Sequence, residues 1–147
     1  MKRITTFLIL CILAAAMPCV SASGGVTGSL SIVKADKTEV LGKLSPGTSF
    51  MVGGSFTNNE NKPVKYSVYC GVYAGDRLYA VYKGDTNTLE TLGTADGYCG
   101  AQIPENIPYL NYYIKAFALS EESVRPLCPA LSYDASGAYE TERYTNT

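Results

Sequence analysis

Apolar and polar side chains alternate along much of the chain after Ser29, which is the pattern of half-buried β-strands. The clearest run covers residues 64–73. Alternate positions of that run would share one buried face: Val64, Tyr66, Val68, Cys70 and Val72. Similar runs predict strands over residues 29–33, 50–56, 78–83, 98–103, 112–119 and 125–133, with a short edge strand within 84–96. No segment has a helical period, so we predict an all-β fold, an antiparallel two-sheet sandwich.

The first residues have the pattern of a secretory signal peptide. Lys2 and Arg3 precede an apolar run over residues 4–17, and small side chains follow at Val20-Ser21-Ala22. The run is shorter than the ~20 residues that cross a bilayer. We therefore expect residues 1–22 to be removed after Ala22 and the protein to be secreted, without a membrane span. We expect a flexible arm over 23–28, the sandwich domain over 29–133 and a mobile tail over 134–147.

Composition argues against most reaction chemistry. Without residues 1–22 the chain has 147 − 22 = 125 residues and a formal net charge of (12 − 2) − 13 = −3, which gives no electrostatic reason to bind nucleic acid. The chain has no histidine, so it lacks the usual base of an acyl-transfer triad and the usual nitrogen ligand of zinc. We expect no catalytic residue, no metal site and no cofactor.

Three cysteines follow the leader, namely Cys70, Cys99 and Cys128. An odd number in an exported protein indicates one disulfide with a free thiol, or a bridge to another chain. Cys70 and Cys99 fall on predicted strands that could face each other from the two sheets. A disulfide between them would stabilise the fold by about 3.5 kcal/mol in the chain-entropy model.

Tyrosines form the main surface signal. Tyr69 and Tyr73 lie on the opposite face of their strand from Tyr66, and Tyr79 could join them across a hairpin, depending on register. Three rings on one sheet face would suit the stacking of a sugar or the docking of a protein. Cross-strand aromatic packing explains the same pattern, and we favour it.

Several segments together resemble a known module. They are 54–59 (Gly-Ser-Phe-Thr-Asn-Asn), 68–73, 75–78 (Gly-Asp-Arg-Leu), 103–106 (Ile-Pro-Glu-Asn), 113–117 (Tyr-Ile-Lys-Ala-Phe) and 125–128 (Arg-Pro-Leu-Cys). The succession resembles the fibronectin type III/immunoglobulin-like modules of secreted and surface proteins from clostridia-type bacteria. The chain departs from them at Leu119, where these modules commonly have tryptophan. The resemblance implies a spacer or accessory β-sandwich, with Cys128 as the free thiol.

We therefore expect a secreted, non-enzymatic binding module that acts at or outside the bacterial cell surface, on a protein or a glycan. One alternative is a carbohydrate-binding module that uses Tyr69, Tyr73 and Tyr79. Another is an immunoglobulin-like protease inhibitor that uses the loops over 57–63 and 84–96. We expect a monomer, and a disulfide-linked dimer through Cys128 is the alternative.

Overall fold

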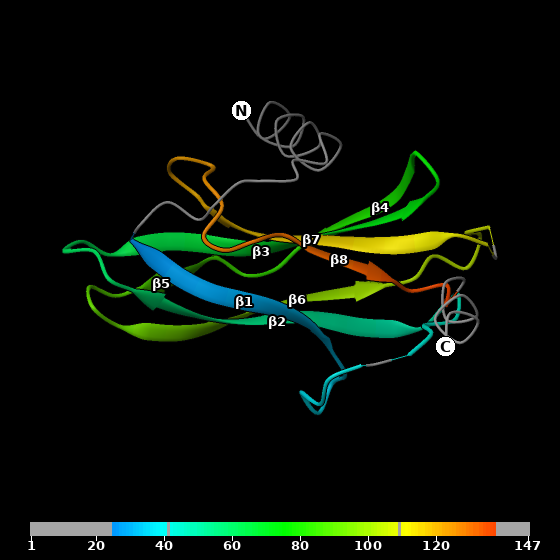
Figure 1. Cartoon of the computed structure of the whole chain (residues 1–147), viewed down its shortest axis with the longest axis horizontal. Helices are drawn as coiled ribbons and strands as arrows, with labels where there is room; N and C mark the ends of the chain where they lie inside the picture. The colour runs from blue at the N-terminus through cyan, green and yellow to red at the C-terminus, as the bar shows by residue number, and fades with distance from the viewer. Residues whose placement is uncertain (1–24, 41, 109, 138–147) are drawn as a thin grey trace, which may run out of the picture.

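The computed structural model describes residues 25–40, 42–108 and 110–137 (Figure 1). The predicted leader and the tail beyond Gly137 lie outside these residues. These residues form eight β-strands and contain no helix. In chain order the strands are β1 (Val26–Val33), β2 (Ser49–Asn58), β3 (Val64–Ala74), β4 (Arg77–Lys83), β5 (Asn87–Leu89), β6 (Thr94–Gln102), β7 (Tyr112–Ser120) and β8 (Leu131–Asp134).

The strands form two antiparallel sheets that lie face to face (Figure 1). The smaller sheet has the order β1-β2-β6. The larger has the order β4-β3-β7-β8, and β5 adds to one end of β3. This arrangement confirms the predicted two-sheet antiparallel sandwich and the predicted hairpin between β3 and β4.

The alternation in β3 decides which side chains fill the space between the sheets. Val68, Cys70 and Val72 are at most 1% exposed. Their partners directly across in β7 are Ala118, Ala116 and Ile114, which are all fully buried. Directly opposed residues of paired strands share a face, so both strands present their apolar residues to the same core.

An aromatic pair lies between the two sheets. Phe56 of β2 and Tyr66 of β3 are both fully buried, and their ring centroids lie 5.1 Å apart in an edge-to-face arrangement. Gly28 and Gly54 make room for Phe56, because a Cβ on either glycine would lie 2.6 Å from its ring. The sheet therefore accepts this large ring beside a glycine of β1 and a glycine two residues earlier in β2.

The free edge of β6 is covered from the other sheet. The Tyr66 hydroxyl donates a hydrogen bond to the Asp96 carbonyl at 3.1 Å, and the Tyr82 hydroxyl donates to the Gln102 carbonyl at 2.9 Å. An open edge with unpaired carbonyls invites pairing with another chain. These two tyrosines partly satisfy that edge.

Two predicted boundaries were wrong. The expected arm over 23–28 contains the start of β1, because Val26 is 2% exposed and pairs with Asn58. The last strand is also shorter than predicted. Only an isolated bridge joins residues 125–130 to β7, where Leu119 is opposite Pro126 and the Leu127 amide donates to the Ala118 carbonyl at 2.9 Å.

The start of the predicted mobile tail is packed against the body of the protein. Asp134 ends β8, and Ala135 and Ser136 are 0% and 7% exposed. The carbonyl of Ala135 accepts a hydrogen bond from the Leu44 amide at 2.9 Å. The ordered domain therefore extends past the predicted end at residue 133.

Candidate binding surfaces

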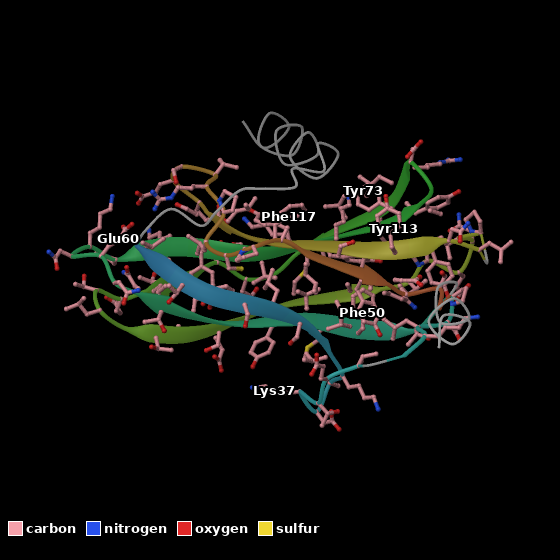
Figure 2. The ribbon with its side chains drawn as sticks, viewed as in Figure 1. Lys37, Phe50, Glu60, Tyr73, Tyr113 and Phe117 are labelled. Atoms are coloured by element: carbon pink, nitrogen blue, oxygen red, sulfur yellow. The ribbon has the colours of Figure 1, made fainter. Side chains whose placement is uncertain are left out.

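The register of β3 places Tyr69 and Tyr73 on the outer face of the larger sheet, as predicted. The residues opposite them in β7 are Phe117 and Tyr113 (Figure 2). Tyr79 does not join this face. An irregularity in the β3–β4 pairing puts Leu78 opposite Tyr73, and Tyr79 packs against the core instead. The predicted trio of tyrosines is therefore corrected to a cluster with Tyr113 and Phe117.

Packing engages the rings of this cluster. Tyr69 and Tyr73 are each 4% exposed, and Tyr73 stacks on Tyr113 with centroids 5.3 Å apart and planes within 7° of parallel. Burial raises the pKa of Tyr73 to about 12. The Lys115 ammonium lies 5.6 Å from both centroids of that stacked pair. Little of Tyr69 or Tyr73 is left for a ligand, which agrees with the packing interpretation.

A polar cluster borders this aromatic face. Glu121 accepts a hydrogen bond from the Tyr69 hydroxyl at 3.0 Å and forms an ion pair with Lys83 at 3.1 Å. Burial alone would raise the pKa of Glu121, but hydrogen bonds from Ser67, Lys83 and Tyr69 outweigh it, so the pKa is lowered. The carboxylate therefore stabilises the folded state.

The Glu121→Gln variant is expected to lose about 0.5–1 kcal/mol of folding free energy at pH 7, because the ion pair is partly exposed. A carboxylate with a lowered folded-state pKa stabilises above its unfolded-state pKa of about 4.3 and loses that contribution as the pH falls through the folded-state value. Urea unfolding at pH 7 and pH 3 measures the loss of folding free energy, which should be smaller at pH 3. Glu122→Gln is the control, because Glu122 is exposed and forms no ion pair with another described residue. A loss that is equal at both pH values would contradict this assignment.

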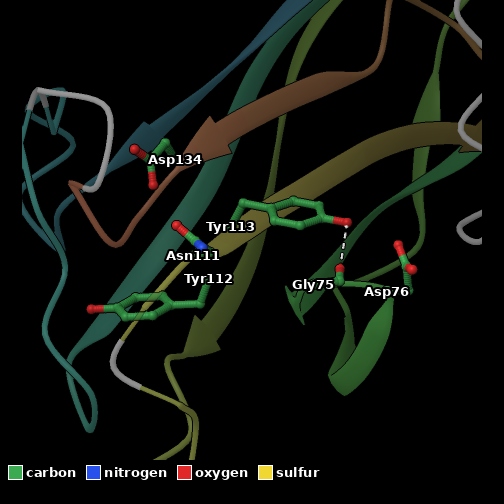
Figure 3. A pocket seen from close by; sticks show the side chains of 6 residues that line it. All are labelled: Gly75, Asp76, Asn111, Tyr112, Tyr113 and Asp134. Carbon is green, nitrogen blue, oxygen red and sulfur yellow. Dashed lines mark hydrogen bonds between the residues drawn. The ribbon is translucent and has the colours of Figure 1, made fainter. Parts of the chain in front are cut away.

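A hollow of about 320 Å³ lies at one end of the aromatic face (Figure 3). Tyr113 lines it, with its hydroxyl donating to the Gly75 carbonyl at 3.1 Å. Asp76, Asn111 and Asp134 supply polar groups around the ring. An aromatic ring with carboxylates and an amide nearby is suited to binding a polar ligand. The sequence contained a signal for this site in the alternation at residues 112–119, but only the register joins Tyr113 to Tyr73.

The two loops predicted as inhibitor contacts lie side by side, because Asn58 joins them. Its side chain is fully buried, and its amide nitrogen reaches the carbonyls of Lys62 at 2.8 Å, Leu89 at 3.3 Å and Glu90 at 3.2 Å. The backbone amide of Asn58 also donates to the Gly93 carbonyl at 2.8 Å. This end of the sandwich therefore presents both loops as one surface.

The three described cysteines are free thiols, so the predicted Cys70–Cys99 disulfide is absent. Cys70 belongs to β3 of the larger sheet and Cys99 to β6 of the smaller one, and both thiols are fully buried. Cys128 is free as expected but only 2% exposed, so it does not offer a thiol to a second chain. Burial raises the pKa of Cys99 and of Cys128 to about 11, and it raises that of Cys70 further.

We expect the thiols of the native protein to resist alkylation, since both burial and a raised pKa suppress the reactive thiolate. Unfolding without a reductant should make Cys70, Cys99 and Cys128 all react with iodoacetamide. Peptide mapping by mass spectrometry reports each site separately, and the fully reduced protein is the control. Protection of Cys70 and Cys99 in the unfolded, non-reduced protein would instead reveal a disulfide.

Within the described residues, no cluster of three or more cysteine and acidic side chains is arranged to hold a metal ion. No helix in that part of the chain is long and apolar enough to cross a bilayer. The chain matches no protein-family model and no curated protein.

Solved structures with a similar fold belong to much larger chains. A domain of Bacteroides uniformis β-glucuronidase 2 matches with a TM-score of 0.51 and 13% identity, over 74% of this chain and 14% of that one. Pseudomonas fluorescens alkylpurine DNA glycosylase AlkC, bound to DNA with an abasic site analog, matches with a TM-score of 0.53 and 12% identity, over 76% of this chain and 30% of that one. At such low identity the likeness shows the fold alone.

Proposed function

We propose that this chain is an exported, non-enzymatic binding module that works at or outside the bacterial cell surface. The observation that carries the proposal is the contrast between interior and surface. The space between the sheets is filled by apolar side chains, whereas the hollow beside Tyr113 brings an aromatic ring together with Asp76, Asn111 and Asp134. Such a surface suits recognition of a polar partner, and the leader sequence provides export.

We further propose that the sandwich is of the fibronectin type III/immunoglobulin-like type. The strand orders β1-β2-β6 and β4-β3-β7-β8 support this, as do the sequence segments that resemble such modules. We propose a monomer, which agrees with the buried position of Cys128.

Fractionation of the producing bacterium tests the proposal. We expect the protein in the medium or on the surface, with residues 1–22 removed, and we expect saturable binding to isolated cell walls or to a protein recovered from the medium. Heat-denatured protein is the control for non-specific adsorption. Retention in the cytoplasm with the leader intact, or turnover of a substrate by the purified protein, would overturn the proposal.

A second candidate is inhibition of a protease by the loops at the other end of the sandwich. Asn58 holds these loops side by side, and Leu92, which belongs to the second of them, is 69% exposed. An apolar residue presented on a fixed turn is a plausible contact for a protease cleft. Micromolar inhibition of a papain-like protease that is lost in Leu92→Asp would support this function, and no inhibition by the native protein would exclude it for that class of protease.

A further inference from the structure

A second hollow, of about 240 Å³, lies on the outer face of the smaller sheet. It is on the opposite side of the sandwich from the Tyr73–Tyr113 stack, on the side where Figure 2 places Lys37. The hollow spans all three strands of this sheet. Its lining belongs entirely to described residues of β1, β2 and β6 and to Lys37.

Strand register creates this hollow. One row across the sheet is Ser31, Gly53 and Tyr98, and the next row is Ser29, Ser55 and Asp96. Because Gly53 has no side chain, the ring of Tyr98 lies low across the middle strand. A Cβ at Gly53 would lie only 2.8 Å from that ring. The ring is therefore held against the sheet, and it remains partly exposed.

The polar groups of the hollow are available to a ligand. The side chains of Ser29, Ser31, Ser55 and Asp96 make no hydrogen bond to another described residue, and all except Ser31 are exposed. The Lys37 ammonium lies 4.8 Å from the centroid of the Tyr98 ring. One ring thus has hydroxyls, a carboxylate and an ammonium around it.

We propose that this hollow binds a neutral glycan chain, with Tyr98 as the stacking platform. The inference rests on the proposed binding function and names its ligand class and its site. A pyranose has an apolar C–H face for the ring, and its hydroxyls both donate and accept hydrogen bonds. Serine hydroxyls do the same, while Asp96 accepts and Lys37 donates. A sugar stacked on Tyr98 moves Lys37 to the rim of the hollow, where its N–H groups reach ligand hydroxyls.

The charge and shape of the hollow favour this ligand over the other common polymers. Lys37 and Asp96 cancel in formal charge, so the hollow lacks the positive potential that draws nucleic acid or an acidic polymer. Protein interfaces usually contain several buried apolar anchors at their centre, whereas this hollow contains one aromatic ring among hydroxyls. One aromatic ring surrounded by hydroxyl groups is complementary to a ligand with many hydroxyls, such as a sugar.

Binding of the native protein to soluble β-glucan and xylan and to insoluble chitin tests the inference. We expect at least one of these glycans to bind, and Tyr98→Ala to weaken that binding by at least about tenfold. Tyr98→Phe should keep most of the affinity because it keeps the ring. Ser55→Arg should abolish binding by filling the hollow, whereas Ser132→Arg, the same change at an exposed position of the other sheet, should leave it intact.

Thermal unfolding of each variant separates lost binding from lost folding. Ser55 is exposed, so Ser55→Arg should disturb folding less than Tyr98→Ala does. Absence of binding to every glycan, or equal binding by native protein and Ser55→Arg, overturns the inference. If the protein still binds cell walls or a secreted protein in those cases, the proposed binding function stands with a different site or ligand. If it binds none of them, both proposals fail.

Discussion

Replacing Phe56 by alanine is expected to lower the free energy of unfolding by about 3–5 kcal/mol. The ring is fully buried between the sheets and meets Tyr66 edge to face. Gly28 and Gly54 face the same space, so no neighbouring side chain on these positions can collapse into the cavity. Equilibrium unfolding in urea measures the loss.

Two variants control this measurement. Phe56→Leu keeps part of the volume and should lose less, about 1–2 kcal/mol. Ser55→Ala lies next along β2 but on the exposed outer face, so we expect a change within about 0.5 kcal/mol. If Phe56→Ala unfolded at the same urea concentration as Ser55→Ala, the assignment of Phe56 to the centre of the core would be wrong.

Asn58→Ala is expected to destabilise the protein by about 2–4 kcal/mol, because it leaves buried carbonyls without a donor. The amide nitrogen of Asn58 serves Lys62, Leu89 and Glu90, and its side-chain oxygen accepts from the Glu60 amide at 2.9 Å. One side chain therefore satisfies backbone groups in both loops. Loss of these hydrogen bonds should let the two loops unfold locally at a lower free energy than the rest of the sandwich.

Urea unfolding gives the size of this effect, and amide hydrogen exchange gives its location. In Asn58→Ala the Glu60 amide should lose protection from exchange. Amides in the centres of β3 and β7 should still exchange only through global unfolding of the variant. Asn59→Ala is the matched control, since Asn59 is exposed and its side chain makes no hydrogen bond to a described residue. Equal stability of the two variants would contradict the bridging role.

The outer surfaces illustrate where prediction from sequence ended. Alternation placed Tyr69 and Tyr73 on the outer face of β3, but the irregular pairing beside Val72 turned Tyr79 to the core side. Tyr113 and Phe117 complete the face because β7 pairs with β3 in one particular register. A shift of one residue in pairing reverses every side chain of a strand, and the sequence of one strand does not specify its partner's register.

The cysteines illustrate a second limit. Cys70 and Cys99 both face the core, as alternation along their strands predicted. Whether two such residues form a disulfide depends on the separation of their Cα atoms across the sandwich, which local patterns do not fix. The sequence identified the face on which each cysteine lies, and only the structure shows that Cys70 and Cys99 are free thiols.

The sequence by itself determined that this protein is built of strands, which side chains of β3 fill the core, and that histidine chemistry is excluded, because these follow from residue type and a period of two along single segments. Only the tertiary structure decided which strands are neighbours. In that arrangement Phe56 packs on Tyr66 beside two glycines, and the ring of Tyr98 packs over Gly53. Asn58 links two loops by hydrogen bonds. Each of these contacts links residues far apart in the chain, and their distances depend on how the two sheets pack.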